Sequence, residues 1–283
     1  MFPEALEFHV AEYVNNGINW LLHTYAPTFD SISSAISFVL MSIQGGLTAI
    51  PWYVYIILVG GLAWMVSKKV SLVIVLSAML MLIGIFGLWD LAIDTLAVII
   101  TAVILSLIFG IPLGILMAEV DHAKAVMKPI LDGMQTMPSF VYLIPAMMFF
   151  GLGKVPAVFA TLIYSMPPVI RLTDLGLRQV PKSTQEAALA YGSTKWQLLK
   201  EVRVPLAMPN IMAGINQTTM MALAMVVVCS MIGARGLGQE VLLSINRIDV
   251  GHGFESGFSI VILAIVIDRI TQGFARRWDP NKR

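Results

Sequence analysis

TLAVIITAVILSLIFGIPLGILMA, residues 95–118, contains no acidic or basic side chain. An α-helix rises about 1.5 Å per residue, so about 20 apolar residues are enough to cross the hydrocarbon core of a bilayer. This run exceeds that length without a single charge. We therefore predict that residues 95–118 form a transmembrane helix, and the rest of the chain has to be compatible with a protein built in a membrane.

The overall composition agrees with a membrane protein. Of 283 residues, 58% are hydrophobic and 12% are charged, whereas soluble domains are about 45–50% apolar and about 25% charged. The formal net charge of +1 gives no basic field that could hold nucleic acid. These values exclude a cytosolic enzyme, a disordered chain and a nucleic-acid binder. The single cysteine, Cys229, excludes a disulfide framework and a cysteine-based zinc site.

Six other apolar runs have the length or the flanking residues of membrane spans. Residues 51–66 form a short run, but Trp52 and Trp64 supply the aromatic anchors that are common at membrane interfaces. Together with residues 95–118, the predicted spans are 51–66, 70–89, 133–153, 155–170, 206–234 and 256–275. The sequence thus predicts an all-α polytopic membrane protein with about seven transmembrane helices.

The basic residues predict the orientation of these spans. If the spans alternate, the segments 67–69, 119–132 and 171–205 share one side with the C-terminal tail. That side receives all the Lys and Arg residues except Lys154, Arg235 and Arg247. Because cytoplasmic loops carry an excess of Lys and Arg, we expect these segments in the cytoplasm and the N-terminus outside.

The N-terminal region allows two interpretations. Ser31–Ile50 is apolar but interrupted by serines, Gln44 and two glycines, and no Lys or Arg precedes Lys68. A spanning Ser31–Ile50 would place the N-terminus in the cytoplasm without the basic residues expected there. We therefore expect Ser31–Ile50 and residues 4–24 to be interfacial amphipathic helices. The N-terminus also lacks the basic residues of a cleavable signal peptide.

The segment 171–205 is the largest polar interruption between apolar runs. Ser183 and Glu186 have the spacing of a capping box, which predicts a helix start there. Gly192 permits a turn after that helix. Trp196 contributes to a small apolar face, and Pro205 precedes the next span. A short helix of small residues on a polar loop is suited to insert into a groove of a partner protein.

This loop resembles that of type I ABC importer permeases, which carry Glu-Ala-Ala, then Gly, then Ile-x-Leu-Pro at fixed spacing. The matching residues here are Glu186, Ala187, Ala188, Gly192 and Pro205, with Val202 and Val204 as conservative departures. The resemblance implies that 186–192 is a coupling helix. It also implies a core of five transmembrane helices.

Other segments resemble the glycine betaine/proline betaine permeases of that class. The segments are 132–142, 166–171, 214–217, 236–238 and 268–272. The resemblance implies a permease subunit that pairs with a second copy of itself. Two ATP-binding subunits would dock from the cytoplasm, and an extracytoplasmic binding protein would deliver the solute. ATP and Mg would be bound by the partner, and this chain would bind no cofactor and would be no enzyme by itself.

The expected domains follow from these assignments. Residues 1–50 form the N-terminal helices, 51–90 two accessory transmembrane helices, and 91–275 the type I transmembrane domain with its loop 171–205. Residues 276–283 form a cytoplasmic tail. The expected location is the bacterial cell membrane.

Polar and aromatic residues within the spans are candidates for the translocation pathway. Asn216, Gln217 and Thr218 interrupt an apolar run, where polar groups are costly unless they are hydrogen-bonded. Hydrogen bonding between helices is the simpler interpretation, and pore lining is the alternative. Phe140 and Tyr142 could offer ring faces to a methylated ammonium, but core packing or lipid contact is the simpler interpretation of each.

Gly236 and Gly238 lie in a glycine-rich segment that is expected outside the cell. We interpret them as part of a turn or of an outer gate. A self-sufficient secondary carrier remains the main functional alternative, but it would call for charges in the middle of the spans. The solute could be glycine betaine, proline betaine, choline, carnitine or proline.

Overall fold

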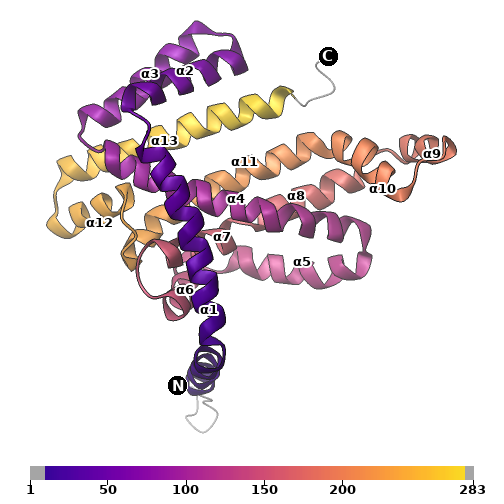
Figure 1. Ribbon diagram of the computed structural model, residues 1–283, viewed down its shortest axis with the longest axis horizontal. Helices are drawn as coiled ribbons and strands as arrows, with labels where there is room; N and C mark the ends of the chain where they lie inside the picture. Colours follow the sequence, from indigo (N-terminus) through magenta and orange to yellow (C-terminus); the bar gives the residue numbers. More distant parts are fainter. Residues whose placement is uncertain (1–9, 278–283) are drawn as a thin grey trace, which may run out of the picture.

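The computed structural model describes residues 10–277, and every regular element within that range is helical. The centre of the fold is formed by α4 (Trp89–Glu119), α7 (Lys154–Ser165), α8 (Pro167–Arg178) and α11 (Val204–Cys229). These helices run side by side in Figure 1. In α4 and α11, apolar residues lie on most faces, which explains why these two helices pack against several neighbours or face lipid.

Small residues allow the central helices to approach closely. A Cβ at Gly114 of α4 would lie 2.7 Å from the carbonyl oxygen of Ile170 in α8. A Cβ at Gly214 of α11 would lie 3.1 Å from Cα of Val169 on the same helix α8. Close backbone approach through small residues is the usual way in which helices pack within a membrane. The packing therefore fixes α8 between α4 and α11.

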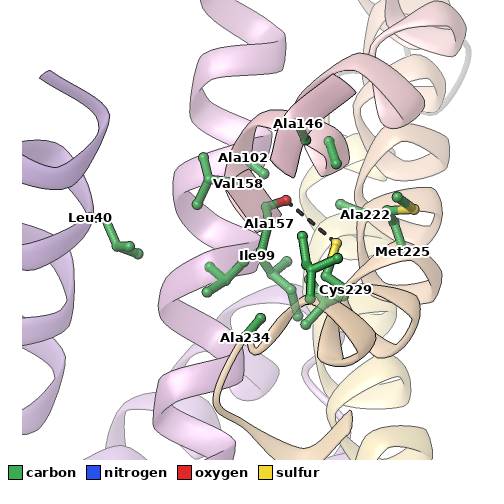
Figure 2. Close-up of a cluster of buried hydrophobic side chains, with 14 of the residues drawn as sticks. Leu40, Ile99, Ala102, Ala146, Ala157, Val158, Ala222, Met225, Cys229 and Ala234 are labelled. Carbon is green, nitrogen blue, oxygen red and sulfur yellow. Dashed lines mark hydrogen bonds between the residues drawn. The ribbon is translucent and has the colours of Figure 1, made fainter. Parts of the chain in front are cut away.

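The largest apolar core fills the space between these helices (Figure 2). Ile99 from α4, Val158 from α7 and Met225 from α11 contribute to it. Cys229 is fully buried in the same core, with its Sγ atom 3.6 Å from the carbonyl oxygen of Ala157.

The region 119–153 differs from the prediction. Instead of a loop followed by one span, it forms α5 (Asp121–Thr136), a 3₁₀ turn η2 (Ser139–Tyr142) and α6 (Leu143–Phe150). The predicted single span 133–153 is wrong because Pro138 interrupts it: the preceding Met137 is extended and proline has no N–H to donate. The predicted loop 119–132 is largely helical.

The helical stretch formed by α7 and α8 is also longer than the predicted span 155–170. Together α7 and α8 occupy Lys154–Arg178, so the first part of the predicted loop 171–205 is helical. The two arginines that follow the predicted span lie within α8 and form ion pairs there. Arg171 pairs with Asp132, and Arg178 pairs with Asp174. A charge that is paired does not have to end a helix.

Three further helices form a second layer. The pair α2 (Trp52–Ser67) and α3 (Val70–Ile85) packs against α13 (Val250–Arg277), which follows α12 (Leu237–Arg247). The predicted accessory helices 51–66 and 70–89 correspond to α2 and α3, with α3 ending earlier at a turn. The predicted spans 206–234 and 256–275 correspond to α11 and α13.

The N-terminal helix α1 (Val10–Thr48) is one kinked element where two separate helices were expected. The kink lies at Tyr25, two residues before Pro27, where a proline inside a helix disturbs the preceding turn. In Figure 1, α1 runs crosswise to α4, α8 and α11. Its contacts are with α4, α6 and α7. Residues 1–9 lie outside the described residues, as do residues 278–283 of the predicted tail.

By length and composition, five helical stretches of the described chain could each cross a membrane: Val10–Thr48, Trp89–Glu119, Lys154–Arg178, Lys195–Ile232 and Val250–Phe274. The helices α2 and α3 and the stretch Ser139–Phe150 are apolar but shorter. The all-α, multi-span class is confirmed. The count of seven stays a prediction, since short helices can also be accommodated by local thinning of the bilayer.

Candidate functional site

The segment that resembles a coupling loop lies at one end of the bundle, opposite α12 (Figure 1). We call this the α9 end, and the opposite one the α12 end. The segment consists of α9 (Lys182–Ala190), α10 (Lys195–Gln197) and η3 (Leu198–Arg203), a π-helix that leads into α11. None of the α9 residues is buried. The short helix is thus displayed at the tip of the protein.

Gly192 ends α9 by a Schellman motif. Its φ is +86°, and its N–H donates to the carbonyl oxygen of Leu189 at 2.9 Å. The N–H of Ser193 donates to the carbonyl oxygen of Ala188 at 3.1 Å. Glycine is favoured at this position because side chains with a Cβ are strained at positive φ. No atom of the described chain lies within 4 Å of a Cβ built at Gly192, so only the backbone conformation and outside partners restrict this position.

The predicted capping box at Ser183 and Glu186 is wrong. The N-cap of α9 is Pro181, and no side chain caps this helix. A capping box does form eleven residues further along, where Thr194 and Gln197 bond each other's backbone N–H groups at the start of α10. Pro181 fixes the backbone one residue before α9 and thereby moves the helix start ahead of Ser183. Glu186 is consequently free of a capping role and exposed.

The base of the loop is attached firmly to the bundle. Leu198 is buried, and Arg203 forms an ion pair with Glu119 at the end of α4. Arg203 also donates from Nη2 to the carbonyl oxygen of Leu177 in α8, at 3.4 Å. Pro205 lies two residues after Arg203 and cannot donate to a carbonyl one turn earlier, which fits the π-helical hydrogen bonding of η3 before it.

More ion pairs connect the helices at the α9 end. The carboxylate of Asp174 in α8 is largely buried and meets Arg178 Nε at 2.7 Å and Lys124 Nζ at 2.9 Å. Arg178 also contacts Asp121 at 2.8 Å and the carbonyl oxygen of Met117 at 2.7 Å. These contacts join α4, α5 and α8 into one unit beneath the loop. A displacement of the loop would therefore reach three helices together.

The exposed surface of the loop is unusually apolar for a polar end of the protein. Tyr191 is 94% exposed and Trp196 is 68% exposed, and Leu189 is also exposed. They lie beside Glu186 and Ala187, which are exposed as well. Apolar side chains displayed together in this way mark interaction surfaces in many proteins.

At the α12 end, Gly236 in the loop before α12 and Gly238 in the first turn of that helix are packing residues. A Cβ at Gly236 would lie 2.5 Å from Oγ1 of Thr95, and one at Gly238 would lie 2.9 Å from Cα of Val227. The N–H of Leu237 donates to Oγ1 of Thr95 at 2.8 Å. The loop before α12 is therefore pressed against α4 and α11, and the structure agrees with a turn at this position.

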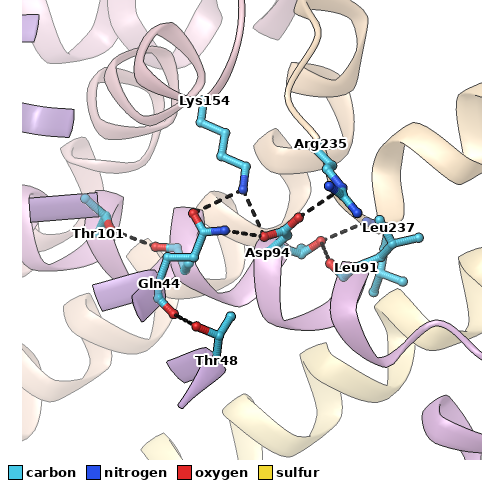
Figure 3. A network of polar contacts seen from close by, with 10 residues as sticks. Gln44, Thr48, Leu91, Asp94, Thr101, Lys154, Arg235 and Leu237 are labelled. Carbon is cyan, nitrogen blue, oxygen red and sulfur yellow. Dashed lines mark hydrogen bonds and ion pairs between the residues drawn. The ribbon is translucent and has the colours of Figure 1, made fainter. Parts of the chain in front are cut away.

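A polar network surrounds Asp94 at the same end (Figure 3). It was not predicted from the sequence. The Asp94 carboxylate meets Lys154 Nζ at 2.9 Å and Arg235 Nε at 3.3 Å, and it accepts from Gln44 Nε2 at 2.7 Å. Lys154 also donates to Gln44 Oε1 at 3.2 Å. One buried carboxylate thus joins α1, α4, α7 and the loop before α12.

The sequence contained a usable signal for this network. Lys154 and Arg235 are two of the three basic residues predicted outside, and Asp94 directly precedes the charge-free run 95–118. An acid at the edge of a span is costly without a partner. That cost could have suggested that Asp94 pairs with a cation. It could not have shown which of the basic residues is the partner.

The three polar residues of α11 point to different sides. Asn216 bonds to α13, donating to Asp268 Oδ1 at 3.2 Å and accepting from Thr271 Oγ1 at 2.6 Å. Gln217 is exposed, and Thr218 is buried with its hydroxyl lacking a hydrogen-bond partner in the described chain. Successive helical residues are rotated by about 100°, so they cannot line one surface together. Interhelix bonding, the simpler interpretation, accounts for Asn216.

The two aromatic candidates are separated in the same way. Tyr142 is buried, donates its hydroxyl to the carbonyl oxygen of Met134 at 2.5 Å, and contacts the ring of Tyr164 edge-on. Phe140 is half exposed. The structure therefore leaves Gln217 and Phe140 as the accessible pathway candidates, since Tyr142, Asn216 and Thr218 lie inside the protein or bond to a neighbouring helix.

Residues 110–283 match a family described as binding-protein-dependent transport system inner membrane component. The chain is 44% identical to the glycine betaine/proline betaine transport system permease protein ProW of Escherichia coli (strain K12), over 93% of this chain and 74% of that protein. It is 43% identical to the glycine betaine transport system permease protein OpuAB of Bacillus subtilis (strain 168), over 93% of both chains.

A third relative is the glycine betaine/carnitine transport permease protein GbuB of Listeria monocytogenes, 48% identical over 80% of this chain and 81% of that protein. Among solved structures, the inward-facing MetNI methionine ABC transporter contains a similar chain. The TM-score is 0.61 at 20% identity, over 65% of this chain and 93% of that one. At this identity the likeness bears on the fold alone.

Proposed function

Because the chain belongs to the family of binding-protein-dependent transport system inner membrane components, we propose that it is the permease subunit of an ATP-driven importer for glycine betaine or a related quaternary-amine osmolyte. The observation that carries this proposal is the identity of 43–44% to two glycine betaine permeases over 93% of the chain. Related transporters named for carnitine and choline leave the range of solutes wider than glycine betaine.

In this proposal the exposed α9 segment docks on a separate ATP-binding subunit. Support comes from the apolar side chains of Tyr191 and Trp196 beside Glu186, and from the absence of buried residues in α9. Closure of a pair of ATP-binding subunits would pull on α9, and the ion pair of Arg203 with Glu119 would pass the displacement to α4. Packed helices move as rigid bodies between discrete states, which suits such a transmission.

A second copy of this chain would complete the pathway. The motive is that one chain offers a single α9 segment, whereas the ATP-binding partner acts as a pair, and two-fold symmetry is the commonest closed arrangement. Along α11, the exposed residues Leu206, Ala213, Gln217 and Ala224 follow helical spacing and form one stripe. We assign this stripe, together with Phe140, to the interface between the two copies. An extracytoplasmic binding protein would dock at the α12 end.

The proposed orientation places the α9 end in the cytoplasm, in line with the distribution of Lys and Arg. The N-terminus would then lie outside, and α1 would lie in the outer interface. Its crosswise course over the bundle supports this placement. So do the aromatic side chains exposed along its first half, Tyr13, Trp20 and Tyr25, since aromatic rings are common at membrane interfaces.

The test of the function is reconstitution of this chain in liposomes with its ATP-binding and binding-protein partners. Labelled glycine betaine should accumulate only when ATP is supplied on the side of the ATP-binding subunit. Competition by carnitine, choline and proline would rank the solutes. Uptake that continues without the ATP-binding subunit and follows an ion gradient would show a secondary carrier instead.

Replacing Gly192 with Val tests the role of the loop. Valine at φ +86° introduces strain on the order of 1–3 kcal/mol, which is comparable with typical coupling free energies between sites. We expect the complex to assemble while betaine uptake and solute-stimulated ATP turnover no longer rise together. Glu186→Ala should act in the same direction but more weakly, because it removes one exposed charge.

Gly87→Val is the matched control. Gly87 has a φ of +72° and open space around its Cβ position, as Gly192 has, but it lies between α3 and α4. The two substitutions therefore introduce similar backbone strain at opposite ends of the protein. If Gly192→Val retains both rates of the parent, or if Gly87→Val uncouples equally, α9 is not the coupling element.

A further inference from the structure

A pocket opens between the α2–α3 turn and α13. It has a volume of about 430 Å³. Its walls include apolar side chains of α2 and α3, among them Val66 and Leu72, and its lining includes the cationic residues Lys69 and Arg269. We call it the α2–α3–α13 pocket.

The two cations of this pocket are not neutralised within the described part of the chain. Lys69 and Arg269 are both exposed, and neither side chain forms an ion pair with a described residue. The acid next to Arg269 in the chain is Asp268, and it is engaged elsewhere. Its carboxylate accepts from Gln272 Nε2 at 2.7 and 2.8 Å and from Asn216 Nδ2 at 3.2 Å.

The surroundings of the pocket are those of a membrane protein's lipid-facing surface. Val70, Ile74 and Val75 are exposed on α3, and this helix is apolar over its whole length. A helix that is apolar all round faces lipid when it lies at the edge of a bundle. A molecule bound in the pocket would therefore contact cations at one end and apolar, lipid-facing side chains along the walls.

We propose that the α2–α3–α13 pocket binds the headgroup of an anionic phospholipid, with its phosphate between Lys69 and Arg269 and its acyl chains along α2 and α3. Basic pockets between transmembrane helices are suited to anionic headgroups. A soluble phosphate would satisfy the cations but would leave the apolar walls unused. The bound lipid would hold the α2–α3 pair against α13, since a ligand that binds only the packed state stabilises it.

The experiment uses the full chain in complex with its ATP-binding partner, in detergent micelles, and measures bound lipid by native mass spectrometry. Phosphatidylglycerol is titrated against phosphatidylcholine of the same chain length. We expect selective binding of phosphatidylglycerol. Each basic residue near an anionic surface contributes about a fivefold change in affinity. The double substitution Lys69→Gln with Arg269→Gln should therefore raise the dissociation constant by about 30-fold.

The matched control is Lys128→Gln with Arg247→Gln, which removes the same charge from exposed positions without ion pairs in the described chain. A separate variant, Ser71→Trp, fills the pocket without changing its charge, because Ser71 lines it. Loss of binding in Ser71→Trp and in the double variant, with the control unchanged, supports the proposal. Because these positions are at the surface, circular dichroism of each variant should match the parent.

Three outcomes would overturn the proposal. Equal binding of the two lipids would show that no headgroup charge is recognised. An equal loss in the Lys128 and Arg247 control would show a bulk charge effect. Displacement of the lipid by glycerol phosphate at the same concentration would show a site for a free anion. The readout does not involve transport, so it is independent of the proposed solute.

Discussion

At the α12 end of the protein, the single carboxylate of Asp94 forms ion pairs with two cations. At the α9 end, acids and bases are equal in number, and some of them have more than one partner. Asp94 is 9% exposed and joins Lys154 and Arg235. The pairs at the α9 end are Lys124–Asp174, Arg171–Asp132, Arg178–Asp121, Arg178–Asp174 and Arg203–Glu119. One network depends on a single residue, and the other is redundant.

This difference fits what each end connects. The Asp94 carboxylate bonds to Gln44 of α1 and to Arg235 of the loop before α12, so its removal would break these polar contacts of both segments with α4 at once. At the α9 end, Arg178 would keep two of its partners if any one were lost. A redundant network can survive rearrangement of individual contacts, which a region that moves between states requires. Three substitutions of Asp by Asn test the comparison.

Asp94→Asn should have the largest effect. It leaves Lys154 and Arg235 without a carboxylate, and breaking a buried pair in this way costs 3–5 kcal/mol in soluble proteins. Because Arg235 is 67% exposed and can be hydrated, we expect the lower end, a loss of about 3 kcal/mol. Denaturant unfolding in mixed micelles, followed by tryptophan fluorescence, measures the loss.

Asp90→Asn is the control for this substitution. Asp90 lies one turn earlier on α4, is exposed, and has no ion pair with a described residue. Its removal should leave the free energy of unfolding within about 0.5 kcal/mol of the parent. Equal losses for Asp90→Asn and Asp94→Asn would mean that the network around Asp94 does not hold this end together.

Asp174→Asn should have an intermediate effect. Its carboxylate is as buried as that of Asp94, but Lys124 and Arg178 are each about one third exposed, and Arg178 retains Asp121 and the Met117 carbonyl. We expect a loss of about 1.5 kcal/mol, the lower value for hydrogen bonds to charged groups. The same unfolding assay applies. A loss as large as that of Asp94→Asn would contradict the redundancy of the α9 end.

The sequence predicted the fold class well because long apolar runs have few alternatives in a membrane. Residues 95–118, 206–234 and 256–275 all lie in helices close to the expected bounds. The errors lie where local rules competed with contacts across the fold. Pro138 interrupts an apolar run that was predicted from the sequence as one span. The helix α8 continues through Arg171 and Arg178 because Asp132 of α5 and Asp174 of α8 form ion pairs with these cations.

The candidate sites were predictable to the extent that they depend on local sequence. The turn at Gly192 followed from a glycine after a short helix, and the structure shows it as a helix cap. The network of Asp94 depends on residues that lie 50 to 141 positions away in the chain. Such pairings are set by helix packing, which periodicity and composition alone do not determine.

Asp121→Asn should have the smallest effect of the three. Asp121 is 91% exposed, and Arg178 keeps its bond to Asp174 without it. Exposed ion pairs contribute about 0–1 kcal/mol, so we expect a loss of at most about 0.5 kcal/mol. That small loss should vanish in about 1 M salt, where the Debye length falls to about 3 Å, while the loss in Asp94→Asn persists because its pair is shielded from solvent. If salt abolished both losses alike, the Asp94 carboxylate would be solvated in the working protein, and the contrast between the two ends would fail.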